Sequence, residues 1–101
     1  MIIYNVTTSV DHAIDEKWLE WMRNSHIPEV MQTNMFTGYK FLKLLTDQED
    51  STGKTYAVQY FCDNLEKYQK YQRLYAPKLQ ADVKSKFGEQ CLSFRTLLEV
   101  I

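Results

Sequence analysis

The stretch "FTGYKFLKLLTDQEDSTGKTYAVQYFC", residues 36–62, decides the fold that we expect for this chain. Its two ends, 36–45 and 54–62, are rich in aromatic residues and other strand formers. The polar segment between them, 47–53, ends in a glycine and is typical of a turn. The stretch therefore predicts a β-hairpin whose two strands are neighbours in an antiparallel sheet.

The segments on either side of this hairpin complete a βαββαβ order. Residues 2–10, "IIYNVTTSV", and 91–101, "CLSFRTLLEVI", alternate between two faces as strands do. Residues 11–34 and 63–88 repeat apolar positions at helical spacing. Because a strand, helix, strand connection is right-handed, the order predicts a ferredoxin-like plait. This is one α+β domain over 1–101, with a four-stranded antiparallel sheet in the order 4-1-3-2 and two helices on one face.

Local signals mark the ends of the two helices. Asp11 or Asp15 can cap the first helix. Pro28 lacks an amide donor, so that helix should kink or restart near residues 25–28. The second helix should begin at a capping box formed by Asp63 and Glu66, be interrupted at Pro77 and end at Gly88.

Composition describes an ordinary globular chain. Its 101 residues are 45% hydrophobic and 25% charged, which suits one domain with a single core. A net charge of −1 provides no field that would gather nucleic acid or an anionic membrane. The start "MIIYNVTTSV" is not typical of a secretory leader, and no apolar run approaches the ~20 residues of a membrane span, so we expect a cytoplasmic protein. Cys62 and Cys91 fit reduced thiols there, and the fold should keep them too far apart to bond.

The face of the sheet without helices should be covered by a second copy of the chain. Its expected residues are too apolar for water yet polar enough at the centre to form hydrogen bonds. We therefore predict a symmetric homodimer, sheet against sheet. The expected residues of this face are Ile3, Asn5, Thr7, Ala57, Gln59, Phe61, Ser93, Arg95, Leu97 and Ile101, and the predicted interface centres on Ile3, Asn5, Gln59, Phe61, Arg95 and Leu97.

An RNA-binding alternative rests on "KTYAVQYF", residues 54–61. The RNA-recognition module has the same βαββαβ order and a basic, aromatic-rich third strand. Here, however, Thr55 stands in place of a glycine and Val58 in place of the stacking aromatic residue. We therefore expect no nucleic-acid partner.

The first helix contains the most distinctive polar residues, in "WLEWMRNSHIPEV", residues 18–30. At 100° per residue, one broad sector of the helix holds Trp18, Trp21, Met22, Ser25, His26 and Glu29, with Glu29 near its middle and His26 toward its edge. A buried carboxylate needs a partner, and the i, i+3 spacing would allow a dyad of His26 and Glu29 like that of a general base. Alternatively, both side chains satisfy backbone groups left open near the proline, or contact a ligand. No second histidine or cysteine has ligand spacing to His26, so no metal is expected.

Two motifs carry a resemblance to known families. The pattern W-x-x-W-M-x-x-x-H-I-P-E-V of the first helix, with "YAVQYF" on the third strand, resembles the dimeric α+β barrel superfamily. That group includes antibiotic-biosynthesis-type monooxygenases, haem-degrading monooxygenases and stress-responsive barrel proteins. Over its whole length, the pattern "MIIYNV…WLEWM…HIPEV…TYAVQYF…YAPKLQ…FRTLLEVI" is similar to a small bacterial family without an assigned function.

The resemblance implies two plaits joined through their sheets, each with a pocket between sheet and helices. Haem-degrading members use an asparagine on the first strand, a tryptophan and a histidine on the second helix. Asn5 matches the asparagine in kind, but the second helix here contains no histidine. Haem is therefore not expected, and no cofactor is predicted.

Two functions remain open at this point. The first is a small-molecule binding or assembly module, because the sequence contains no nucleophile motif, metal motif or cofactor loop. The alternative is a cofactor-independent monooxygenase-like or cyclase/isomerase-like enzyme, in which His26 accepts a proton, Glu29 orients it and aromatic walls hold a flat apolar substrate. The predicted ligand-binding residues are Trp18, Met22, Tyr56, Tyr60 and Tyr68.

Overall fold

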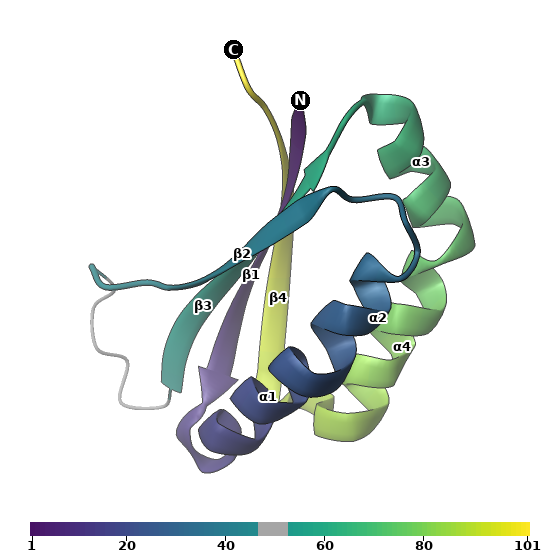
Figure 1. Ribbon diagram of the computed structural model, residues 1–101. Coiled ribbons are helices and arrows are strands. Elements are labelled where there is room, and N and C mark those ends of the chain that lie inside the picture. The colour runs from purple at the N-terminus through teal and green to yellow at the C-terminus, as the bar shows by residue number, and fades with distance from the viewer. Residues whose placement is uncertain (47–52) are drawn as a thin grey trace.

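The protein folds as a sheet with helices on one face, in a computed structural model that describes residues 1–46 and 53–101 (Figure 1). The predicted ferredoxin-like α+β class is confirmed. Short 3₁₀ turns precede α1 and β4. The elements are β1 Ile2–Asp11, α1 Asp15–Trp21, a π-helical turn Met22–His26, α2 Ile27–Met31, β2 Gly38–Lys43, β3 Gly53–Cys62, α3 Leu65–Leu74, α4 Ala76–Phe87 and β4 Cys91–Glu99.

The strands are antiparallel in the order β2-β3-β1-β4, which confirms the predicted 4-1-3-2 arrangement. Cys62 pairs with Ile2 at one end of β1, and Cys91 pairs with Val10 at the other. Both cysteines are free and buried, as expected from that separation. The turn predicted at 47–53 lies outside the described residues except for Gly53, the first residue of β3.

Two prolines shape the helical segments. Pro28 has no amide hydrogen to complete an α-helical turn, and the preceding turn winds as a π-helix in which the amide of Ile27 donates to the carbonyl of Met22. The predicted restart near residues 25–28 takes this form. Pro77 lies in the first turn of α4, and the segment predicted as one helix divides into α3 and α4 at Tyr75.

The helix ends are capped by local polar groups. Asp11 accepts a hydrogen bond from an amide of the 3₁₀ turn that precedes α1, at 2.8 Å. Asn64, and not the predicted Asp63, caps α3 by accepting from the amide of Lys67 at 2.9 Å. Gly88 ends α4 with a φ of 59°, a conformation that favours glycine. The predicted end of the second helix is therefore confirmed.

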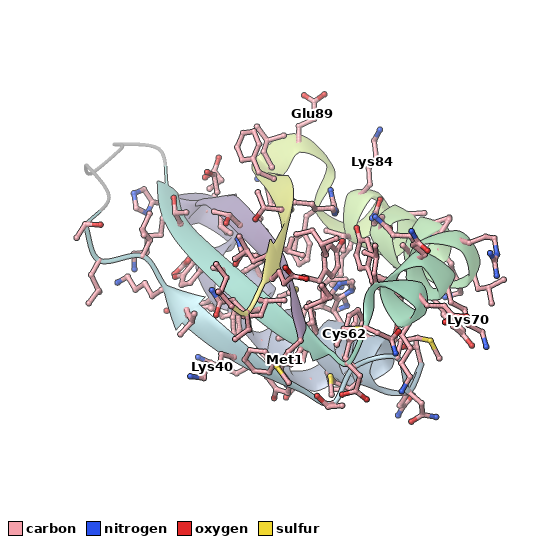
Figure 2. All side chains as sticks on the ribbon, turned by 90° about the horizontal axis from the view of Figure 1, so that it is seen from above. Met1, Lys40, Cys62, Lys70, Lys84 and Glu89 are labelled. Atoms are coloured by element: carbon pink, nitrogen blue, oxygen red, sulfur yellow. The ribbon has the colours of Figure 1, made fainter. Side chains whose placement is uncertain are left out.

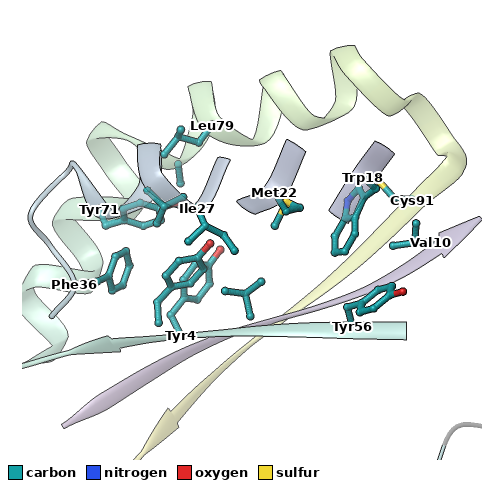
Figure 3. Close-up of a cluster of buried hydrophobic side chains, with 14 of the residues drawn as sticks. Tyr4, Val10, Trp18, Met22, Ile27, Phe36, Tyr56, Tyr71, Leu79 and Cys91 are labelled. Atoms are coloured by element: carbon teal, nitrogen blue, oxygen red, sulfur yellow. The ribbon is translucent and has the colours of Figure 1, made fainter. Parts of the chain in front are cut away.

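The core lies between the sheet and the helices and is rich in aromatic rings (Figure 3). Tyr4, Phe36 and Tyr71 gather at one end, where the ring centroids of Phe36 and Tyr71 are 4.8 Å apart. Trp18 and Tyr56 lie at the other end, with centroids 5.2 Å apart. These two aromatic groups thus lie at opposite ends of the core (Figure 3).

Exposed charged side chains extend into solvent from the layer of helices and from the turn before β4. Lys84 and Glu89 project away from the body of the molecule in Figure 2. Within residues 1–46 and 53–101, no helix is long and apolar enough to cross a membrane.

Candidate functional site

The face of the sheet without helices, here called the open face, carries apolar side chains on its outer strands. Phe94 on β4 is 71% exposed, and Leu42 on β2 is 40% exposed. Its centre is polar, because Asn5 donates a hydrogen bond to Oγ1 of Thr96 at 3.3 Å. Exposed apolar area of this extent is typical of a surface that a partner covers. The exposed apolar residues of the open face are Leu42, Leu44, Leu92, Phe94, Leu98 and Val100.

On β4 the residues of the open face differ from the prediction. Arg95 pairs with Val6, and Leu97 pairs with Tyr4, which is only 3% exposed beneath the helices. Paired residues of neighbouring strands share a face, so Arg95 and Leu97 point to the helix side. Their predicted place in a sheet-to-sheet interface is therefore wrong. The other predicted interface residues, Ile3, Asn5, Gln59 and Phe61, do lie on the open face.

His26 lies at the end of the π-helical turn and is unusually placed for a polar residue. Its ring stacks on Trp21, with centroids 5.1 Å apart and 26° between the planes. Its Nδ1 is buried and has no hydrogen-bond partner among the described residues. Burial lowers the pKa of His26 to about 4; nearby Asp82 raises it and Arg95 lowers it. The imidazole is therefore neutral at pH 7.

Glu29 does not form the expected dyad with His26. Its side chain is exposed and lines a cavity of 260 Å³ between α2 and the junction of α3 with α4. The buried residues of α2 are Ile27 and Val30. In the described part of the chain, the charged groups that shift the pKa of His26 are Asp82 and Arg95. The predicted burial of Glu29 is therefore wrong.

Trp18 and Tyr56, two of the predicted ligand residues, meet at one end of the core. Trp18 is 1% exposed and Tyr56 is 5% exposed. The Tyr56 hydroxyl donates to Oδ1 of Asp15 at 2.7 Å, while Lys54 lies 3.6 Å from Oδ2 of the same carboxylate. Burial and the neighbouring carboxylate raise the pKa of Tyr56 to about 12. Tyr56 also lines a cavity of 310 Å³ between α1 and the hairpin of β2 and β3.

Tyr60 and Tyr68, two further predicted ligand residues, lie at the opposite end. Both neighbour Tyr4, with centroid distances of 6.1 Å to Tyr60 and 5.2 Å to Tyr68. The hydroxyl of Tyr68 accepts a hydrogen bond from Gln72 at 2.6 Å. Burial raises the pKa of Tyr4 and Tyr60. Met22 is 6% exposed in the core, and none of Trp18, Met22, Tyr60 and Tyr68 joins Tyr56 in lining the 310 Å³ cavity.

Sequence reasoning misplaced Arg95, and it left Trp21 out of the predicted ligand residues although the helical wheel put Trp21 in the sector of His26. Arg95 reaches the helix side closely enough to lower the pKa of Tyr4. Trp21 meets His26 only because the π-helical turn lies between them. The signal for that turn was Pro28. Across residues 1–46 and 53–101, no three His, Cys, Asp or Glu side chains group closely enough to hold a metal ion.

Solved structures of low sequence identity share this fold. A Bacillus halodurans protein of the ethyl tert-butyl ether D (EthD) family is 17% identical, with both chains covered in full and a TM-score of 0.69. A Deinococcus radiodurans protein, named as a candidate antibiotic biosynthesis monooxygenase, is 13% identical over 99% of this chain and 92% of that chain, with a TM-score of 0.64. A dimeric ferredoxin-like protein from an uncultured marine organism is 6% identical over 99% and 94%, with a TM-score of 0.66. These identities establish the fold alone.

Comparison by sequence leads to a family without a known activity. None of the curated proteins matches the chain. A family model described as "Domain of unknown function (DUF4286)" matches residues 1–101. The predicted resemblance to a family of unassigned function is thereby confirmed, and the solved structures share the predicted ferredoxin-like fold.

Proposed function

The chain belongs to the DUF4286 family of domains of unknown function, and we propose that it is an assembly module that dimerises through its open face. One observation carries this proposal: the outer strands of the open face bear large exposed apolar side chains, whereas Asn5, Thr7 and Gln59 in the middle of its central strands are polar. The relationship to a protein named as a dimeric ferredoxin-like protein supports it.

The energetics of the open face favour a symmetric pairing. Fully burying one Leu or Phe side chain contributes ~1.5–3 kcal/mol, and a two-fold axis uses each such side chain twice. Phe94 and Leu92 are 71% and 61% exposed in the single chain. The amide groups of Asn5 and Gln59 lie half-buried at the centre, where hydrogen bonds across the interface would fix its register.

Light scattering after size-exclusion chromatography tests the dimer. The chain has a mass of 12.0 kDa, so we expect twice that mass at micromolar concentration. Phe94→Asp should give the monomer, because it places a charge on the open face. Leu65→Asp is the matched control, since Leu65 is 46% exposed on α3 and away from that face. A monomeric wild type, or dissociation by both variants alike, would overturn the proposal.

A second candidate function is small-molecule binding beside His26. The predicted ligand residues Trp18, Met22, Tyr56, Tyr60 and Tyr68 are spread along the core, so this role rests on His26 itself. The specific observation in its favour is the buried Nδ1 of His26, which has no partner within the described residues and would gain one from a ligand. Thermal-shift screening with aromatic polyketides, haem and lipids tests this role. Equal stabilisation of the wild type and of His26→Ala would count against it.

The enzymatic alternative has weaker support. A general base works best with a pKa near the working pH, and the pKa of His26 is about 4. Glu29 is exposed, so it has no evident role in orienting the imidazole. A cofactor-independent reaction with His26 as the base would be revealed if a compound of the same screen is turned over by the wild type and not by His26→Ala.

The cytoplasm remains our proposed compartment, in keeping with the free thiols of Cys62 and Cys91.

A further inference from the structure

We propose that a groove between the first helical segment and the end of α4 binds a flat aromatic carboxylate. The groove is a cavity of 550 Å³, within the size range of small-molecule sites. It is separate from the open face, because it lies in the layer of helices, so the proposal does not depend on the dimer. It is built by the 3₁₀ turn before α1, by α1 with the π-helical turn, by the last turn of α4, and by the 3₁₀ turn after α4.

The apolar wall of the groove is a fixed pair of aromatic rings. Trp21 and Phe87 meet edge to face, with centroids 5.4 Å apart and 75° between the planes. Phe87 is 7% exposed, so it holds its neighbour in place, while Trp21 is half-buried and lines the groove. Such a wall suits a planar apolar group, which gains from offset or edge-to-face contacts.

The π-helical turn is what makes this wall rigid. In an α-helix, residues five apart point about 140° away from each other, at 100° per residue. The π-helical turn between Trp21 and His26 brings their rings together instead, as a stacked pair. The imidazole therefore supports one face of the indole, and the missing donor of Pro28 is the sequence feature behind that support.

The charged side chains around the groove favour a ligand that carries a negative charge. Lys17 and Lys86 both line it, against a single carboxylate from Glu20. The ammonium of Lys86 lies 5.8 Å from the centroid of the Phe87 ring, so one cation sits next to the aromatic wall. Asn24 adds a neutral amide donor. A ligand with a flat ring and an adjacent carboxylate would place its ring against Trp21 and its carboxylate near the lysines.

The two tryptophans of the chain allow a sharp test by NMR. In the ¹⁵N-labelled protein, 2-naphthoate should shift the indole N–H signal of Trp21 and leave that of Trp18, which is 1% exposed, in place. Trp21→Phe assigns the two signals. Lys86→Gln and Lys17→Gln should each weaken binding about three-fold, the size expected of a partly solvated ion pair. Lys84→Gln is the control, because Lys84 is exposed on the same helix but does not line the groove.

A cationic probe shows whether the groove recognises the charge of the ligand or only its apolar ring. 2-Naphthylmethylammonium has the same ring system and should bind several-fold more weakly than 2-naphthoate. The proposal is overturned if neither indole signal moves at millimolar 2-naphthoate, if the Trp18 signal moves instead, or if the two probes bind equally well. It is also overturned if Lys17→Gln/Lys86→Gln, folded by its amide spectrum, binds as tightly as Lys84→Gln.

Discussion

Trp21 and His26 stack across the π-helical turn, with ring centroids 5.1 Å apart and 26° between the planes. Burial at this position opposes the charged form of the imidazole and lowers the pKa of His26 to about 4. The π-helical turn thus places a neutral His26 against Trp21, which lines the groove. The same arrangement leaves Nδ1 of His26 without a partner among the described residues.

The first prediction concerns the stability of the fold against pH. The pKa of His26 falls from 6.5 to about 4 on folding, so the unfolded chain binds the proton more tightly. Stability should therefore be full above pH 6.5 and decline as the pH falls toward 4, by about 3 kcal/mol for this group. In His26→Gln, the part of this pH dependence that arises from His26 should disappear, while the part that arises from the carboxylates should remain. Urea unfolding from pH 7 to pH 4 measures how the free energy of unfolding depends on pH in the wild type and in the variant. The same dependence in both proteins would contradict the role given to His26.

The π-helical turn also explains why a helical wheel misplaced Glu29. A wheel at 100° per residue assumes uninterrupted α-helix, and the π-helical turn inserts one extra residue. The residues after His26 are therefore displaced by one position on the wheel. Val30 occupies the buried place expected for Glu29, and Ile27 fills the turn before it. Sequence signals predicted the break at Pro28, but not the phase of the residues beyond it.

The sequence predicted that the residues of β4 alternate between the two faces of the sheet, but it did not predict which of them point toward the helices. Apolar residues occur on both of its sides, with Phe94 and Leu98 on one and Leu97 on the other. An edge strand has few contacts to distinguish them, so hydropathy alone does not decide which side meets the helices. The strand order, in contrast, follows from connection rules and was predicted correctly.

The second prediction tests the turn after α2. Asn34 has a φ of 62°, in the left-handed region that asparagine and glycine tolerate best. Asn34→Ala should lower the free energy of unfolding by about 1 kcal/mol. Asn34→Gly should leave it nearly unchanged, because the lost strain offsets the greater freedom of the unfolded chain. Urea denaturation compares the two, and equal losses would mean that φ is not the cause.

The third prediction concerns the hydrogen bond between Tyr56 and Asp15. The hydroxyl is 2.7 Å from Oδ1 in a largely buried setting. Tyr56→Phe should cost about 1.5–3 kcal/mol of stability, the usual range for a hydrogen bond to a charged group. The cycle with Asp15→Asn isolates the coupling between the two side chains. A coupling energy near zero would show that the loss arises elsewhere.

The last prediction uses two glycines of the hairpin with opposite surroundings. A Cβ added at Gly53 would collide with the backbone carbonyl of Val10 on the neighbouring strand, which has no room to move within the ladder. A Cβ at Gly38 would instead make ordinary contact with the ring of Phe61 at 3.5 Å. Gly53→Ala should therefore destabilise the fold by about 2 kcal/mol or more, as overpacking does, while Gly38→Ala should stay within about 1 kcal/mol of the wild type. Thermal unfolding of the two variants checks this contrast, and equal melting temperatures would show that β1 and β3 do not approach each other this closely at Gly53.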